Sequence, residues 1–239
     1  MEVFMKNYAI VDFRIYKEEE DNLIKLGYDV IKCPPSSNLY DSVFGHPDML
    51  IHFIDKKNVI FHRDMENNFI NFFKSLNFNV FLSDKSLETK YPNNIKLNAV
   101  NLKNYFIHNI DHTDSLLLNM IGNKKLLNVK QGYTKCSTAV VNDNAIITSD
   151  TGIAKIAKDE NIDVLLLPPG DISLPGLDYG FIGGCCGLLD KDRLAFFGDL
   201  NYYAYGKEIL DFLYKYDVKP IYLREGKLID RGSLFVVKS

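Results

Sequence analysis

Five short polar turns recur along the chain, and each separates two apolar segments. The turns read KN, KKN, LKN, NDN and DKD, and they end at Asn7, Asn58, Asn104, Asn144 and Asp192. The intervals between these residues are 51, 46, 40 and 48, which is a loose common period. A period of roughly 20 to 50 residues is typical of proteins built from repeated units that must pack on one another to bury a core. The repeat therefore constrains the fold more than any other feature of the sequence.

Each turn is followed by the same order of predicted elements. In the first unit the apolar run YAIVDF has strand character, and KEEEDNLIKLG has the acidic first turn and glycine stop of a helix. A second strand in YDVIKC and a third in GHPDMLIHFI complete the unit. We therefore expect an α/β fold in a single domain, 1–239. The predicted repeats span approximately 7–57, 58–103, 104–143, 144–191 and 192–239. An open α/β sheet of five unequal units is the alternative interpretation.

Composition and motifs exclude several classes of function. The formal net charge is -3 and the charges form no blocks, so we expect no nucleic-acid partner and no membrane partner. No run of about 18 apolar residues occurs, and MEVFMKNYAI lacks the pattern of a secretory signal, which predicts a soluble, cytoplasmic protein. The chain contains no G-x-x-x-x-G-K run, no G-x-S-x-G run and no zinc-type cysteine spacing, so we expect no cofactor and no metal.

The chain has four cysteines, of which Cys185 and Cys186 are adjacent. Adjacent cysteines seldom bridge each other because the intervening peptide strains the link, so we expect free thiols in a reducing compartment. Counted back from the following turn, Cys136 lies eight residues before Asn144 and Cys185 lies seven before Asp192, so the two are nearly equivalent. Cys186 should then alternate to the other side of the strand and pack. The alternative for each cysteine is a small buried side chain without a chemical role.

The repeat and four short runs resemble the pentein fold, the five-bladed α/β propeller of the guanidino-group-modifying enzymes. The runs are GHPD, KQGYTKCS, PPG and GFIGG, and they are similar to those of an uncharacterised bacterial family assigned to this fold. The resemblance covers essentially the whole chain and implies five blades around a pseudo-fivefold axis, each a small three-stranded sheet with a helix. In the catalytic members, the loops before the innermost strands converge on the axis. There a cysteine attacks a guanidinium carbon, a histidine in a His-x-Asp run moves protons, and carboxylates hold the cation.

This resemblance implies a catalytic set in which Cys136 is the nucleophile, His46 the general acid-base group, and Asp48 its partner or a substrate ligand. His46 and Asp48 stand before the third strand of the first predicted blade, and Cys136 stands before that of the third. Lys135 would lower the pKa of the thiol if it points the same way. The further substrate-binding candidates are Cys185, Asp230, Asp178, Asp12 and Arg231. The structural alternatives are a turn-capping imidazole at His46 and an Asx turn at Asp48.

These residues predict a cysteine-dependent hydrolase or deiminase of a small guanidino or amidine compound. The chain departs from the pattern of the enzymes, because their cysteine lies near the C-terminus, whereas the last unit here, LIDRGSLFVVKS, has none. No EGGD-like run is present either, and a catalytic Cys136 requires a site rotated by two blades. The alternative is a non-catalytic pentein that binds a protein, ribosomal or metabolite partner. An open axial pocket that holds His46 and a cysteine favours the enzyme, and an axis plugged by bulky side chains favours the binding protein.

Overall fold

The computed structural model of the chain describes residues 6–239, so residues 1–5, part of the segment used for the export prediction, lie outside the described residues. The described part contains five three-stranded sheets. In each sheet a middle strand runs antiparallel to one neighbour and parallel to the other. With the antiparallel neighbour first, the sheets are β15 (Phe235–Lys238), β1 (Asn7–Asp12) and β2 (Tyr28–Cys33); β3 (Ile51–Phe53), β4 (Asn58–Phe61) and β5 (Asn79–Leu82); β6 (Val100–Asn101), β7 (Tyr105–His108) and β8 (Lys125–Asn128); β9 (Thr138–Asn142), β10 (Ala145–Thr148) and β11 (Asp163–Leu166); and β12 (Cys186–Asp190), β13 (Arg193–Phe196) and β14 (Lys219–Tyr222).

A helix connects the middle strand of each sheet to its parallel neighbour. These helices are α1 (Lys17–Lys25), α3 (Asn67–Ser75), α4 (Ser115–Met120), α5 (Thr151–Asp159) and α6 (Gly206–Lys215), with the 3-10 turns η1 (Ile110–His112) before α4 and η2 (Leu200–Tyr202) before α6. In α5 the Asp150 carboxylate accepts a hydrogen bond from the backbone N–H of Ile153 at 2.8 Å and so caps the helix. Ile153, Ala154 and Ala157 form the buried face of the same helix. The predicted α/β class is confirmed.

The grouping of the strands differs from the predicted blades. The sequence analysis places the third strand of each unit in the same blade as the first two, but β3 pairs with β4, where His52 lies opposite Ile60. The same shift applies to β6, β9 and β12, and the C-terminal β15 pairs with the N-terminal β1. The physical reason is that only a short polar turn joins each third strand to the following strand, and such a turn closes an antiparallel hairpin.

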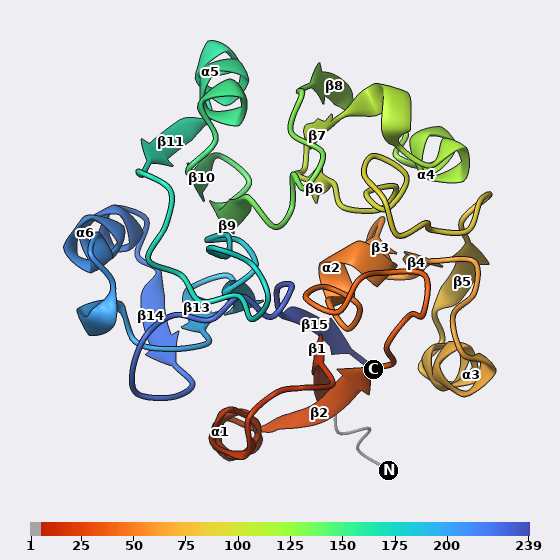
Figure 1. Cartoon of the computed structure of the whole chain (residues 1–239), viewed down its shortest axis with the longest axis horizontal. Helices are drawn as coiled ribbons and strands as arrows, with labels where there is room; N and C mark the ends of the chain where they lie inside the picture. Colours follow the sequence, from red (N-terminus) through yellow and green to blue (C-terminus); the bar gives the residue numbers. More distant parts are fainter. Residues whose placement is uncertain (1–5) are drawn as a thin grey trace.

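Figure 1 shows the five sheets arranged around a common centre, with the long helices at the periphery. The strands nearest the centre are β3, β6, β9, β12 and β15, which we call the inner strands. Buried hydrophobic clusters fill the spaces between neighbouring sheets. In one of them Ala9 and Val11 of β1 pack with Leu189 of β12 and Ala195 of β13. Burial of apolar surface therefore holds each sheet against the next one around the centre.

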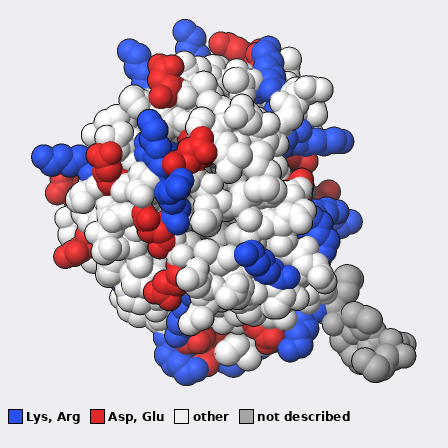
Figure 2. Space-filling model, turned by 90° about the vertical axis from the view of Figure 1, so that its right-hand side faces the viewer, with Lys and Arg blue, Asp and Glu red and all other residues white. Residues whose placement is uncertain are grey.

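The surface carries both signs of charge side by side. Figure 2 shows Lys and Arg interspersed with Asp and Glu on the face turned to the viewer, without a broad patch of one sign. Several of these charges form ion pairs along a helix, such as Lys17 with Asp21 at 2.6 Å. None of the helices that the structure describes is long and apolar enough to cross a bilayer.

Candidate active site

The candidate active site lies where the inner strands begin. The short helix α2 (Pro47–Leu50) precedes β3, and His46 and Asp48 occupy its N-cap and first turn. Proline is well tolerated at the first position of a helix, because the N–H that it lacks has no intrahelical partner there. The backbone N–H of Asp48 donates to the carbonyl oxygen of Gly232 at 3.0 Å. A Cβ at position 232 would lie 2.2 Å from the Cβ of His46, and φ is +65° there, so only glycine allows this approach.

Cys136, Asp48, Asn98 and Ser233 come from the beginnings of four different inner strands and form one hydrogen-bonded cluster. Sγ of Cys136 lies 3.2 Å from both carboxylate oxygens of Asp48. The Asn98 amide donates to the same sulfur at 3.1 Å, and its oxygen accepts from the backbone N–H of Cys136 at 3.2 Å. The Ser233 hydroxyl donates to Oδ2 of Asp48 at 2.7 Å. The thiol is therefore held in place with a carboxylate as its hydrogen-bond acceptor.

His46 lies beside this cluster, with two carboxylates near its ring. Nδ1 is 3.7 Å from Asp230 and Nε2 is 3.9 Å from Asp12. Neither ring nitrogen makes a hydrogen bond to the residues that the structure describes. Burial lowers the pKa of His46, while the charges of Asp230 and Asp12 oppose this shift. The imidazole is therefore neutral at rest, and the two carboxylates stabilise the imidazolium once it forms.

Burial also controls the protonation of the thiol and of the carboxylates. It raises the pKa of Cys136 well above its usual value, and the charges of Asp48 and Asp230 add to this shift. The pKa of Asp48 is raised by burial, against the opposing charge of Lys135 and the hydrogen bond from Ser233. The pKa of Asp230 is raised for the same main reason. At neutral pH the resting thiol therefore keeps its proton, and the site is organised to receive positive charge.

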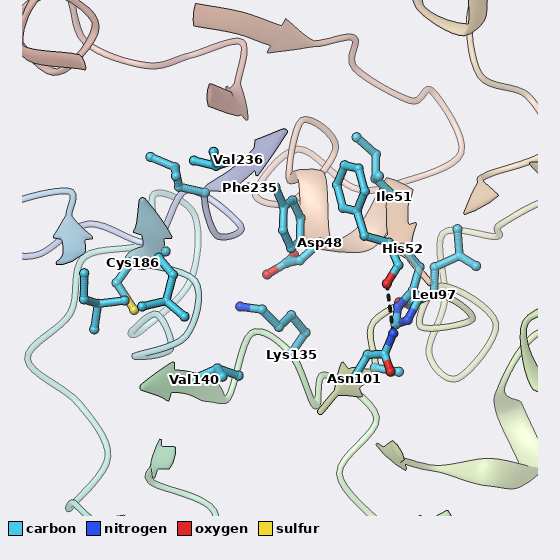
Figure 3. A pocket seen from close by; sticks show the side chains of 16 residues that line it. Asp48, Ile51, His52, Leu97, Asn101, Lys135, Val140, Cys186, Phe235 and Val236 are labelled. Atoms are coloured by element: carbon cyan, nitrogen blue, oxygen red, sulfur yellow. Dashed lines mark hydrogen bonds between the residues drawn. The ribbon is translucent and has the colours of Figure 1, made fainter. Parts of the chain in front are cut away.

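Lys135, the neighbour of Cys136, points away from the sulfur. Its Nζ donates to Oγ of Ser233 at 2.8 Å. It also lines a cavity of about 290 Å³, which we call the second cavity and which is bordered by residues of all five inner strands (Figure 3). Asp48 and Lys135 point toward each other in this view. The charge of Lys135 opposes the rise in the pKa of Asp48, and an effect of Lys135 on the pKa of the thiol stays a prediction.

A different cavity, of about 240 Å³, gives access to Cys136 and His46. Its other polar lining residues are Asp230, which is buried, and Asp178, which is exposed at the mouth. The remaining walls are aromatic or aliphatic and consist of Tyr40, Val43, Tyr133, Leu174, Leu177, Tyr179 and Phe181. We call this space the thiol cavity. A small molecule inside it contacts a thiol, an imidazole and a buried carboxylate at once.

The structure brings together most of the residues proposed from the sequence, although they are far apart along the chain. His46, Cys136, Asp178 and Asp230 line the thiol cavity, and Asp48, which does not line it, contacts the sulfur of Cys136. They meet because the loops before the inner strands all lead to the same centre.

The cysteine pair does not contribute to the thiol cavity, which corrects the expectation that Cys185 binds substrate. The Cys185 thiol donates to the carbonyl oxygen of Ile182 at 3.0 Å, and its side chain is fully buried in a hydrophobic cluster. Cys186, at the start of β12, lines the second cavity instead. The Cys186 thiol also donates to the carbonyl oxygen of Ile182, at 3.3 Å, and Cys186 belongs to the same hydrophobic cluster, so the two thiols are not turned to opposite sides.

Asp12 and Arg231 also lie outside the lining of the thiol cavity, and both have structural partners. Asp12 is fully buried behind His46 and is bound by the guanidinium of Arg14. Arg231 pairs with Glu19 at 3.3 Å. Neither residue therefore lies where it could contact a molecule in the cavity directly. The structure does not support the expectation that Asp12 and Arg231 bind substrate.

Asn98 and Ser233 contact the thiol and the carboxylate, but the sequence analysis did not single them out. Their signal was their position, because both stand just before a third strand, in KLNAV and RGSLF, as Cys136 does in KCSTAV. The aromatic wall residues Tyr40 and Tyr133 gave no such signal, since aromatic side chains are frequent throughout this chain.

His46, Asp48 and Cys136 also form a candidate metal-binding group. One atom from each lies within 4.8 Å of the other two. Imidazole, carboxylate and thiolate are all zinc ligands, and three protein ligands are typical of a catalytic zinc site. In the described geometry, however, Asp48 already accepts hydrogen bonds from the thiol and from Ser233, which suits a cluster that shares protons. The predicted absence of a metal stays a prediction.

Three solved structures resemble the chain over most of its length. The first is SxtG, an amidinotransferase from Microseira wollei in the saxitoxin biosynthetic pathway, with a TM-score of 0.55, 11% identity, and coverage of 90% of this chain and 87% of that chain. DDAH from Pseudomonas aeruginosa, in a mutant form complexed with citrulline, has a TM-score of 0.51 and 12% identity, and the match covers 92% of this chain and 93% of that chain. The inosamine-phosphate amidinotransferase from Streptomyces griseus has a TM-score of 0.50 and 10% identity, and the match covers 88% of this chain and 76% of that chain. All three are penteins, so the predicted resemblance in fold is confirmed.

At the level of sequence, one family matches the chain. It is described as "Family of unknown function (DUF6873)", and the match covers residues 10–235. No curated protein sequence matches the chain significantly. The family match extends from β1 into β15 and includes every residue of the thiol cavity.

Proposed function

The chain belongs to the family DUF6873, and we propose that it is a cysteine-dependent hydrolase or deiminase of a small guanidino or amidine compound. In this proposal Cys136 is the nucleophile, His46 is the general acid-base group, Asp48 is the hydrogen-bond partner of the thiol, and Asp230 holds the cation. The observation that carries the proposal is the cavity of about 240 Å³, which presents a buried thiol, an imidazole and a carboxylate to one small molecule. The similarity in fold to two amidinotransferases and to DDAH supports the same class of chemistry.

The charges of the site explain why a guanidinium or amidinium group fits. A delocalised cation resists nucleophilic attack until acidic groups fix it at contact distance, and a carboxylate binds its N–H groups through charge-assisted hydrogen bonds. Asp230 lines the cavity and can contact a bound cation directly, whereas Asp48 lies outside the lining and acts on the sulfur, which it contacts at 3.2 Å. The entering cation also stabilises the thiolate, which lowers the pKa of Cys136 at the moment when the nucleophile is needed.

The proposed reaction conserves atoms and involves no change of oxidation state. The thiol proton passes to His46, and the thiolate of Cys136 forms a C–S bond with the guanidinium carbon. His46 then gives its proton to the leaving nitrogen as the C–N bond breaks, which leaves a thiouronium on the sulfur. Water next attacks this carbon while His46 accepts a proton from it, and the C–S bond breaks as the thiol regains a proton. One water is consumed, and ammonia and a urea are released.

The proposal extends to the architecture and to the setting. The pairing of β1 with β15 and the arrangement in Figure 1 support a closed five-bladed α/β propeller formed by one domain, 1–239. The four cysteines are all free and buried. Because the proposed nucleophile has to remain a thiol, a reducing compartment such as the cytoplasm suits it.

The test combines product formation with detection of the covalent intermediate. The purified protein is incubated with a panel of guanidines and amidines, released ammonia is measured, and acid-quenched samples are weighed by intact mass spectrometry. We expect turnover and an adduct on Cys136 with at least one compound. Cys136→Ser should abolish both, and His46→Asn should slow both steps strongly. Cys185→Ser, the matched change at a buried cysteine outside the cavity, should retain activity.

Two controls separate the alternatives. Treatment with a chelator should leave turnover intact, because the proposed chemistry uses a thiol and no metal. If the folded protein gives neither ammonia nor an adduct with any compound of the panel, the enzyme proposal is wrong, and the chain is better treated as a pentein that binds a partner.

A further inference from the structure

The thiol cavity is one-sided in charge. Among its lining residues Asp178 and Asp230 are acidic, and His46 is neutral at rest. No lysine or arginine lines it within the described part of the chain. The cavity therefore offers partners for positive charge at its buried end and at its mouth, and it offers no positive charge of its own.

The cations nearest to the site are engaged elsewhere. Arg14 binds Asp12 behind the imidazole, and Arg231 pairs with Glu19 at 3.3 Å. Lys135 projects into the second cavity, where Figure 3 shows it pointing toward Asp48. To reach a ligand in the thiol cavity, each of these side chains would have to leave its present partners.

An anionic group on a ligand would therefore be unfavourable in this cavity. A carboxylate taken from water needs a cation or several hydrogen-bond donors to replace its hydration. Here it would instead meet the carboxylates of Asp178 at the mouth and Asp230 inside. The same two carboxylates favour a ligand that is cationic at its reacting end and neutral or cationic at its other end.

The walls of the cavity define the middle part of the ligand. The rings of Tyr133 and Phe181 are stacked with their centroids 6.4 Å apart, and Tyr40, Leu174 and Leu177 complete an apolar lining. Aromatic faces attract cations and pack against methylene groups. The volume of about 240 Å³ is of the order of a guanidinium with a short alkyl chain.

We propose that the thiol cavity selects a guanidine or amidine that carries no carboxylate, with a short apolar chain that ends in a neutral or cationic group at Asp178. This inference rests on the proposed function and deepens it, because it separates alkyl and aminoalkyl guanidines from guanidino acids. Asp178 is the specificity-determining residue of the mouth, since it is exposed there and makes no ion pair within the described residues.

The test uses three compounds of matched length, namely pentylguanidine, guanidinobutylamine and guanidinobutyrate. Binding is measured as protection of Cys136 from alkylation by iodoacetamide, which does not depend on turnover, and ammonia release is measured in parallel. We expect pentylguanidine and guanidinobutylamine to protect at concentrations about tenfold or more below that of guanidinobutyrate. Protection by guanidinobutyrate at an equal or lower concentration would overturn the inference and leave the proposed function intact.

Asp178→Lys provides the matched reversal of charge. We expect it to strengthen protection by guanidinobutyrate by about fivefold and to weaken protection by guanidinobutylamine by a similar factor. Asp192→Lys, the same change at an exposed turn residue between β12 and β13, should alter neither value. If Asp178→Lys leaves the preference for guanidinobutylamine over guanidinobutyrate unchanged, Asp178 is not the specificity-determining residue. If none of the three compounds protects Cys136 or releases ammonia, the proposed function fails together with this inference.

Discussion

Replacement of Asp48 by asparagine should make Cys136 more acidic. The change removes a negative charge 3.2 Å from Sγ and keeps the shape of the side chain. At this distance two unit charges interact by about 5 kcal/mol at an effective dielectric constant of about 20, which equals about four pKa units. The effective negative charge on Asp48 is weakened, because burial raises the pKa of this carboxyl group and Ser233 donates a hydrogen bond to it. We therefore expect about half of the full effect, which is a fall of about two units in the pKa of the Cys136 thiol.

The measurement is the alkylation rate of Cys136 by iodoacetamide at pH 8, resolved by peptide mass spectrometry. A fall of two pKa units gives about a hundredfold more thiolate, and the weaker nucleophilicity of a more acidic thiol removes about a factor of ten, so we expect alkylation about tenfold faster. The control Asp178→Asn removes an exposed carboxylate at the mouth and should change the rate by less than about twofold. An unchanged or slower rate in Asp48→Asn would refute the reasoning, because burial alone would then set the pKa of the thiol.

Three further predictions concern the scaffold. His52 is buried with its pKa lowered to about 4, so below pH 6.5 the unfolded chain binds more protons than the native chain, and stability falls as the pH falls. From pH 7 to pH 5 this one group should lower the free energy of unfolding in urea by about 2 kcal/mol. His52→Gln should remove this loss, and His112→Gln, at a half-exposed position, should leave it in place. Gly183→Ala places a Cβ 2.3 Å from the carbonyl oxygens of Lys135 and Thr138, and thermal unfolding should show a loss of about 2 kcal/mol or more, whereas an unchanged midpoint would contradict the close packing. If 1–239 is one domain, urea transitions followed by circular dichroism and by tyrosine fluorescence should coincide, and two separate transitions would show independent units.

The local pattern of the sequence predicted the elements well but not the way in which strands combine into sheets. Alternating and helical hydrophobicity depends on neighbours along the chain, so the strand in NYAIVD and the cap at Asp150 were both predictable. Sheet membership depends on which strands pair, and the predicted units ended at each polar turn, although a turn such as NDN between two apolar strands is itself a hairpin signal. For the same reason the pairing of the C-terminal strand with the N-terminal one was not foreseen, because no local feature links residues at opposite ends of a chain.

The site residues were predictable only where a chemical motif marked them. His46, Asp48 and Cys136 carry reactive groups in short runs that resemble a known pattern, so they were proposed before their contacts were known. Asn98 and Ser233 are common polar residues, and only their equivalent position before a third strand relates them to Cys136. Packing decides whether a side chain just before a third strand faces the cavity or the core. The sequence alone therefore could not show that Cys136 faces the cavity while Cys185 is buried in the core.

The neutral resting thiol has a consequence for selectivity. Burial and two carboxylates raise the pKa of Cys136, so the free site holds almost no thiolate at neutral pH. A guanidinium carbon about 4 Å from the sulfur would stabilise the thiolate by about 4 kcal/mol at an effective dielectric constant of about 20, which equals about three pKa units. A neutral molecule of the same shape, such as an alkylurea, supplies no such charge, so the pKa of Cys136 should stay high when it is bound. In the proposed mechanism the cation thus stabilises the thiolate that attacks it, and the carboxylates of Asp48 and Asp230 keep the thiol protonated in its absence.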